Sequence, residues 1–203
     1  MTTTMRRAAR WAMAVLGALA MGPAASGAEW QSLFNGRDLA GWVPVHDVRF
    51  EVHDGRLRLV RGMGWLRTEK EYGDFVLEVE LRPLVERYDS GLFFRVGLEG
   101  KPWPTDGWQI NLRRDLWGAL IQGYRTVLRS PVEGPDVDEE EPWSKFRIEV
   151  RGRKATLEVD GKRVWEFDGI DRERGYLGIQ AEDRVFDFRS LRVRELDGAG
   201  GEG

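Results

Sequence analysis

Four polar side chains that could together perform acid–base chemistry occupy alternate positions in three apolar segments. They are Glu80, Arg95, Gln109 and Asn111. A carboxylate can accept a proton, a guanidinium can stabilise negative charge that develops on oxygen, and amides can hold hydroxyl groups. If the three segments are neighbouring strands, these side chains form a polar platform in which Glu80 and Arg95 are the candidate catalytic pair and the two amides bind substrate.

The orientation of these residues follows from the strand period, because alternate side chains of a strand point to the same side. In DFVLEVELRP the apolar residues 75, 77, 79 and 81 share one face, so Glu80 points outward. The same alternation predicts that residues 92, 94 and 96 of SGLFFRV point inward and that Arg95 points outward. In GWQINL it turns Gln109 and Asn111 outward. The alternative interpretation is an ordinary solvated outer face.

Three further residues are candidate substrate contacts. Trp103 lies between prolines in KPWPTDGW, where a rigid aromatic face could stack on a sugar, although packing at the edge of the core is an equal alternative. His46 precedes the first hairpin and could reach the edge of a site. Lys70, in TEKEYGDF, either contacts substrate or stabilises a turn.

The sequence predicts no metal site. The segment PVEGPDVDEEEPW is rich in carboxylates, which calcium prefers, but their spacing matches no defined calcium loop and favours a solvated surface loop. The two histidines, His46 and His53, have no carboxylate pattern nearby and give no zinc signal.

Short alternating segments joined by glycine turns predict an all-β fold. Hairpins are expected at Asp54-Gly55, at Arg151-Gly152 and at Asp160-Gly161. The chain has 203 residues, 25 of them glycine, and no helical period appears after its N-terminal segment. The number and spacing of the strands favour a jelly-roll β-sandwich of two antiparallel sheets.

The first residues differ from the rest of the chain. Arg6, Arg7 and Arg10 precede the apolar run WAMAVLGALAMG and a stretch of small residues. This pattern predicts a signal peptide over residues 1–28, and therefore an exported protein, periplasmic or extracellular. The alternative is an uncleaved membrane anchor, but the run is only about a dozen residues and a spanning helix needs about 20. Residues 29–196 are the predicted domain, and 197–203 are a predicted disordered tail.

The charge pattern argues against a polyanionic partner. The chain carries 31 basic and 34 acidic residues, interspersed, for a net charge of -3. Nucleic acid is therefore not an expected partner. The sequence contains no cysteine, so the core must be stable without disulfides. The oligomeric state is not predicted.

Five motifs occur in a recognisable order: SLFNGRDLAGW, EVHDGRL, TEKEYGDFVLEVELR, SGLFFRV, and finally GYLGIQ with VFDFRSLRV. In this order they resemble the family once called domain of unknown function 1080, described as 3-keto-disaccharide hydrolases or 3-keto-glucoside lyase/hydratases. The resemblance spans nearly all of the chain after residue 28 and implies a concanavalin A-like jelly roll. It also implies that Trp42 is a core residue.

The resemblance implies an enzyme that cleaves 3-keto-glycosides by elimination and hydration, with Glu80 as base and Arg95 stabilising the enolate. A divalent metal is possible in relatives. This sequence has Asn111, and Gln122 with Gly123, where the family usually carries acidic residues. It also has Gln180-Ala181-Glu182-Asp183 in place of Gln-Asp-His-Gly. These departures keep open the alternative of a non-catalytic carbohydrate-binding or surface module on the same fold.

Overall fold

The computed structural model describes residues 29–138 and 143–197. The predicted signal peptide, residues 1–28, and most of the predicted tail, residues 198–203, lie outside this range. Within it, no helix is both long enough and apolar enough to cross a membrane.

Strands dominate the described chain, and the only regular helix among its residues is a short 3-10 helix, η1, Arg114–Leu116. The expected hairpins form at Asp54-Gly55 and Asp160-Gly161. The hairpin predicted at Arg151-Gly152 turns one residue later, at Gly152-Arg153, because Arg151 is still paired with Lys154. The strands are β1 (Gln31–Ser32), β2 (Trp42–His53), β3 (Arg56–Tyr72), β4 (Phe75–Pro83), β5 (Gly91–Val96), β6 (Trp108–Asn111), β7 (Leu120–Gln122), β8 (Arg125–Leu128), β9 (Ser144–Arg151), β10 (Lys154–Val159), β11 (Lys162–Asp168), β12 (Gly175–Glu182) and β13 (Phe186–Glu195).

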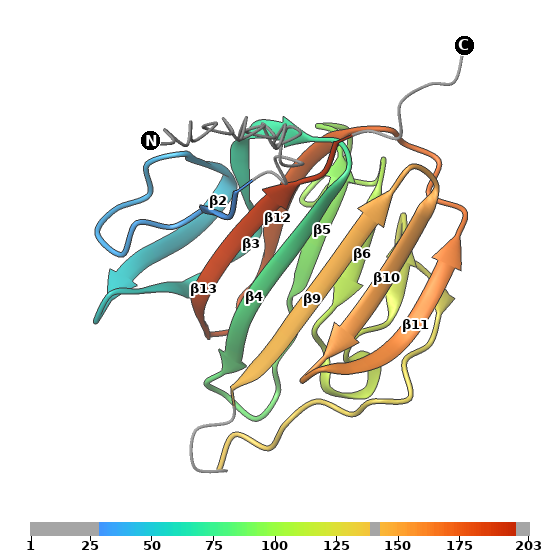
Figure 1. Cartoon of the computed structure of the whole chain (residues 1–203). Helices are drawn as coiled ribbons and strands as arrows, with labels where there is room; N and C mark the ends of the chain where they lie inside the picture. The colour runs from blue at the N-terminus through green and yellow to red at the C-terminus, as the bar shows by residue number, and fades with distance from the viewer. Residues whose placement is uncertain (1–28, 139–142, 198–203) are drawn as a thin grey trace, which may run out of the picture.

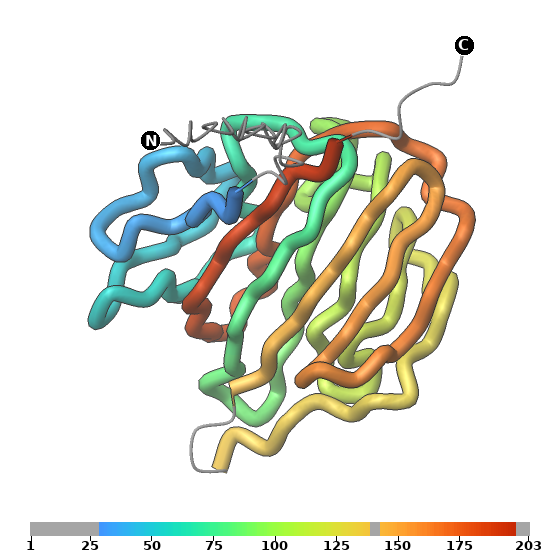
Figure 2. The backbone as a smooth tube through the Cα atoms, viewed as in Figure 1, coloured from blue at the N-terminus to red at the C-terminus, as the bar shows by residue number. Residues whose placement is uncertain are grey.

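The described strands form one continuous antiparallel sheet, in the order β11-β10-β9-β4-β13-β3-β12-β5-β6-β7-β8, with β1 beside β13 and β2 beside β3. The sheet curls until its two halves face each other (Figures 1 and 2). We call β13, β4, β9, β10 and β11 the front half, and β12, β5, β6, β7 and β8 the rear half. The all-β prediction is confirmed. The prediction of two separate sheets is corrected, because β3 pairs with β13 at residues 57–59 and with β12 at residues 63–72.

The change of partner along β3 falls at a glycine. Gly62 has a φ of +117°, and a Cβ atom at this position would lie 2.1 Å from the carbonyl oxygen of Asp47 on β2. Its amide donates to Asp183 Oδ1 at 2.8 Å, and its carbonyl accepts from the Asp183 amide at 3.0 Å. Any side chain at this position would therefore push β2 and β3 apart, and only glycine fits.

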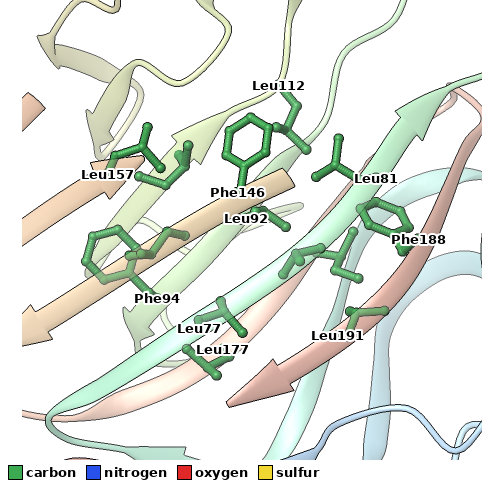
Figure 3. Close-up of a cluster of buried hydrophobic side chains, with 14 of the residues drawn as sticks. Leu77, Leu81, Leu92, Phe94, Leu112, Phe146, Leu157, Leu177, Phe188 and Leu191 are labelled. Carbon is green, nitrogen blue, oxygen red and sulfur yellow. The ribbon is translucent and has the colours of Figure 1, made fainter. Parts of the chain in front are cut away.

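Apolar side chains from both halves fill the space between them (Figure 3). The front half contributes Leu77, Leu81, Phe146 and Phe188, and the rear half contributes Leu92, Phe94, Leu112 and Leu177. The predicted core faces of β4 and β6 are confirmed. Trp42 is buried, as predicted, and its indole Nε1 donates to the carbonyl of Leu33 at 2.6 Å.

Asp187 of β13 points away from the apolar core of the front half. Arginine side chains from both neighbouring strands cover its carboxylate, so that it is fully buried. Arg58 of β3 donates to both of its oxygens, at 2.6 and 2.9 Å, and Arg82 of β4 donates at 3.2 Å. Burial raises the pKa of Asp187, but the hydrogen bonds from Arg58 and Arg82 outweigh burial, so its pKa lies below the ordinary value. The carboxylate therefore stays ionised and joins three strands.

We expect Asp187→Asn to lower the free energy of unfolding by about 3 kcal/mol at pH 7, because the change leaves three partly buried arginines, Arg56, Arg58 and Arg82, without their anion. Urea unfolding measures this difference. Because the folded-state pKa is depressed, the contribution is present above the unfolded pKa of about 3.9 and is lost as the pH falls through the folded value. The parent and the variant should therefore converge in acid. Glu166→Gln, at an exposed ion pair, is the control and should cost less than about 1 kcal/mol. Equal unfolding midpoints for Asp187→Asn and the parent at pH 7 would contradict the prediction.

Candidate functional site

Gln109 and Asn111 point to the outer surface of the rear half, as predicted. Between and beside them on β6, Trp108 and Ile110 are buried in the core. Across the pairing with β5, Gln109 lies opposite Phe93, and Asn111 lies opposite a glycine. We call the outer surface of β3, β12, β5 and β6 the rear face.

A chain of hydrogen-bonded side chains crosses the rear face from β6 to β12. Gln109 Nε2 donates to Gln180 Oε1 at 2.5 Å, and Gln180 Nε2 donates to Glu182 Oε2 at 2.9 Å. The first bond crosses β5, and Gly91 makes this possible, because a Cβ there would lie 1.9 Å from Gln109 Nε2. Next to it, Ser90 Oγ donates to the Gln180 carbonyl at 2.8 Å and holds β12 in place.

Two carboxyl groups at the end of this chain have raised pKa values. Burial raises the pKa of Glu182 to about 7; the negative charge of Asp89 adds to the shift, and Arg184 and Arg113 oppose it. Burial also raises the pKa of Asp89 to about 6, and Arg113 opposes that shift. Asp89 Oδ1 is buried and has no hydrogen-bond partner among the described residues. We call the following residues the carboxylate–amide cluster: Asp89, Gln109, Asn111, Gln180 and Glu182.

Two arginines bring positive charge to the cluster. Arg113 follows β6; its amide donates to Asn111 Oδ1 at 2.8 Å, and its guanidinium donates to Asp115 at 2.5 and 3.0 Å. Arg184 lies in the turn between β12 and β13 and is exposed. A carboxyl group with a pKa near neutrality can either give or take a proton, and nearby guanidinium groups can stabilise an oxyanion. The cluster therefore has the groups that proton transfer at carbon requires.

Trp103 lies over the rear face. It packs with the buried side chains of Trp65, Phe93 and Val96, and its indole Nε1 donates to the Ala181 carbonyl at 2.9 Å. A hollow of only about 20 Å³ remains between Trp103 and Gln109, which is enough for about one water molecule. Of the two predicted alternatives, packing is the one that is seen, and a sugar ring does not fit beneath the indole. Asp89 and Glu182 are both partly exposed residues.

The prediction that Arg95 faces the platform is wrong. Arg95 has a φ of 47°, and the pairing of β12 with β5 shifts register between Tyr176 and Gly178, opposite this residue. This bulge reverses the alternation, so that Val96 packs on the rear face. The Arg95 side chain is only 1% exposed. It donates to the carbonyls of Gly73, Gly152 and Arg172 and to the carboxylate of Asp74, at 2.6 to 3.0 Å.

Glu80 and Arg95 do not form a pair. Glu80 lies on the outer surface of the front half, where its carboxylate accepts a hydrogen bond from Arg189 Nε at 2.7 Å. The same guanidinium lies over the ring of Trp143, 4.0 Å from its centroid. In the sheet order, β13, β3 and β12 separate β4 from β5. The predicted catalytic pair is therefore divided between two faces of the molecule.

The structure links neither of two other candidates to the cluster. His46 is exposed on β2, opposite Gly64, and no hydrogen bond or ion pair links it to the described cluster residues. Lys70 is exposed, forms an ion pair with Glu195, and lies 5.1 Å from the ring centroid of Tyr72. Its contacts favour the structural alternative that the sequence left open.

The donor set on the rear face does not form a metal site. Among residues 29–138 and 143–197, no three or more His, Cys, Asp or Glu side chains are grouped so that they could hold a metal ion. The described residues of the acidic segment 131–143 form no such group either. The groups on the rear face that can act on a substrate are the carboxyl and amide groups of the cluster and the neighbouring guanidinium groups of Arg113 and Arg184.

Sequence analysis did not identify Asp89 and Glu182 as functional candidates. Glu182 was noted only as a departure from a family pattern. The signal that could have located both residues is the pair Ser90-Gly91: Gly91 lets a β6 side chain cross β5, and Ser90 fixes β12. Asp89 immediately precedes this pair, and Glu182 lies two residues after Gln180 on the same side of its strand.

Solved structures with this fold include several carbohydrate-related proteins. A candidate glycosyl hydrolase from Parabacteroides distasonis ATCC 8503 superposes with a TM-score of 0.67 at 18% identity, covering 83% of this chain and 94% of its own. A second one from the same organism gives 0.63 at 21% identity, covering 83% and 100%. The carbohydrate-binding module CBM66 from Bacillus subtilis gives 0.61 at 14% identity, covering 76% and 96%. At these identities the similarity shows the fold alone. No curated protein sequence matches the chain.

The chain folds as a strongly curled, all-β antiparallel sheet. Residues 29–194 match the sequence model of the 3-keto-alpha-glucoside-1,2-lyase-like domain. The chain belongs to this family, as the order of its five motifs predicted.

Proposed function

We propose that the protein cleaves 3-keto-glycosides by elimination followed by hydration, and that the carboxylate–amide cluster is its active site. The observation that carries the proposal is the pair of carboxyl groups, Asp89 and Glu182, with pKa values of about 6 and about 7 at one end of an amide chain. Pairs of titratable groups tuned to near-neutral pKa values are typical of acid–base sites. Membership of the family supplies the substrate class.

The reaction needs a base, an acid and a group that stabilises an enolate. A ketone at C3 acidifies the hydrogen on C2, and ionised Asp89, with the lower pKa, removes it. The C2–H electrons form the enolate, whose oxygen lies near Arg113 or Arg184. As the C1=C2 bond forms, the C1–O bond breaks, and protonated Glu182 gives its proton to the leaving oxygen.

Hydration reverses the two proton transfers. Ionised Glu182 takes a proton from water as the water oxygen bonds to C1, and protonated Asp89 returns a proton to C2. Both carboxyl groups end in their starting states, and the net reaction is hydrolysis. Asn111 and Gln109 have the donors and acceptors to hold sugar hydroxyls during both steps.

A non-catalytic carbohydrate-binding module is the second candidate. It is favoured by the amide of Asn111, which cannot transfer a proton, and by the likeness of the fold to a binding module. A module would bind a 3-keto-glucoside and release it unchanged.

Aglycone release from p-nitrophenyl 3-keto-glucoside by the purified full chain distinguishes the two candidates. Release of nitrophenol supports the enzyme. Saturable binding without release, with and without added divalent metal, supports the module. If the protein neither binds the substrate nor releases nitrophenol, both candidate functions are contradicted.

We also propose that the protein is exported, on the strength of its basic and then apolar N-terminal segment. N-terminal sequencing of the protein recovered from the periplasm or medium tests this. A mature chain that begins near residue 29 is expected, and an intact N-terminus in the cytoplasm would contradict the proposal.

A further inference from the structure

A second hollow, separate from the carboxylate–amide cluster, opens at one end of the sandwich. It has a volume of about 580 Å³ and is formed by the β5–β6 loop, the β7–β8 hairpin and the β11–β12 loop. We call it the end bowl. Its polar lining consists of Thr105, Asp106, Gln122, Arg125, Asp171 and Arg172.

The polar groups of the end bowl are held in place before any ligand binds. Asp171 accepts hydrogen bonds from the Trp108 indole Nε1 and from Gln122 Nε2, both at 3.0 Å. Asp106 accepts from Arg172 Nη1 at 3.0 Å. Such fixed groups lose little conformational freedom when a ligand binds, which favours binding.

The charges of the end bowl point to an uncharged ligand. Two carboxylates, Asp106 and Asp171, balance two guanidiniums, Arg125 and Arg172. The Arg125 guanidinium is exposed and makes no hydrogen bond or ion pair with any described residue, so its donors are available to a ligand. An even mixture of fixed donors and acceptors without net charge suits a polyhydroxylated molecule better than a phosphate or a carboxylate.

An exposed aromatic ring lies next to the end bowl. Tyr124 is at the tip of the β7–β8 hairpin, between Gly123 and Arg125, which line the end bowl; Tyr124 itself lines the adjoining hollow beside Gln109. It is 61% exposed and has a φ of 64°. Bulky residues rarely adopt a positive φ, and such backbone strain is concentrated at ligand sites. The ring packs edge-to-face on Trp103, with 6.2 Å between centroids, so its position is fixed while much of its surface remains open.

We propose that the end bowl is a second carbohydrate subsite that binds a neutral sugar ring. The apolar side of the ring stacks on Tyr124, and its hydroxyls bind Arg125, Gln122 and Asp171. Binding here requires no catalysis at the carboxylate–amide cluster, so the inference goes beyond the proposed function. Gly107 and Gly123 line both the end bowl and the hollow beside Gln109, so the two sites adjoin.

The test is a titration of the ¹⁵N-labelled full chain with maltose and with cellobiose, followed by the Trp108 indole N–H signal. This N–H donates to Asp171 in the end bowl and therefore reports binding there. We expect a saturable shift in the parent, and an affinity about fivefold lower in Tyr124→Asn, since aromatic contacts contribute about 1 kcal/mol. Asparagine tolerates a positive φ, so this variant removes the ring without adding backbone strain.

The controls separate stacking from a change in the fold. Tyr124→Phe keeps the ring and should bind like the parent, whereas Arg125→Gln should bind several-fold more weakly. Leu98→Ser, at an exposed apolar side chain outside the end bowl, should leave affinity unchanged. The proposal is overturned if neither disaccharide shifts the Trp108 signal, if Tyr124→Asn binds as tightly as Tyr124→Phe, or if glucuronate binds more tightly than both sugars. If the protein binds the disaccharides but releases no nitrophenol, only the proposed function is contradicted.

Discussion

Glu182→Gln is expected to slow the cleavage of methyl 3-keto-glucoside by about 10²- to 10⁴-fold, the usual contribution of a general acid or base. Glutamine has the same shape and can still accept the hydrogen bond from Gln180, but it cannot give a proton to the leaving oxygen. Methoxide is a poor leaving group and needs that proton, whereas nitrophenolate leaves without it. The loss should therefore be much smaller for the p-nitrophenyl substrate. Steady-state kcat/KM on the two substrates measures this difference.

The same assignment predicts the pH profile. Turnover needs ionised Asp89, so kcat/KM should rise as the pH passes about 6, and it needs protonated Glu182, so it should fall above about 7. Glu182→Gln should abolish the alkaline limb and leave the acid limb. Asp89→Asn should abolish the acid limb.

Two controls guard against a trivial loss of activity. Glu80→Gln changes the carboxylate that alternation alone selected, and it should leave kcat/KM unchanged because Glu80 pairs with Arg189 on the opposite half of the sheet. Glu182→Gln should be at least as stable as the parent at pH 8, because burial disfavours the ionised carboxylate. Full activity of Glu182→Gln on the methyl substrate would remove Glu182 from the mechanism.

The successes and failures of the sequence analysis have physical causes. The assumption that side chains alternate between the two faces of a strand oriented β4 and β6 correctly, because both strands are regular and one face of each is buried. It failed on β5 after Phe94, because a single residue at positive φ inverts every later side chain of that strand. Nothing in the letters SGLFFRV marks Arg95 as that residue, since arginine has no preference for this conformation.

The site itself depends on sheet order, which alternation does not give. Glu80 and Gln109 appear equivalent in the sequence, yet β4 and β6 lie on opposite sides of the junction that β3 makes. The cluster joins Gln109 to Gln180, 71 residues away, because β5 lies between their strands and carries a glycine at the crossing point. The raised pKa values come from burial in the assembled sheet. Residue types alone therefore indicated amides on this face but not the carboxyl groups beside them.

Arg95→Met is expected to lower the free energy of unfolding by about 3 to 5 kcal/mol, the cost of breaking a buried ion pair. Methionine fills a similar volume but donates no hydrogen bonds, so the Asp74 carboxylate loses its cation and three backbone carbonyls lose a donor. Burial lowers the pKa of the Arg95 guanidinium, and the negative charge of Asp74 opposes that shift. Urea unfolding followed by tryptophan fluorescence gives the difference.

Arg151→Met is the matched control, because Arg151 lines the same end of the sandwich as Arg95 but is 56% exposed and, among the described residues, pairs only with Glu149. It should cost less than about 1 kcal/mol. If Arg95 is purely structural, the fraction of Arg95→Met that remains folded should turn over substrate at the rate of the parent. An unchanged unfolding midpoint together with lost turnover would restore Arg95 to the chemical role that strand alternation gave it, and would require the end of β5 to open during the reaction.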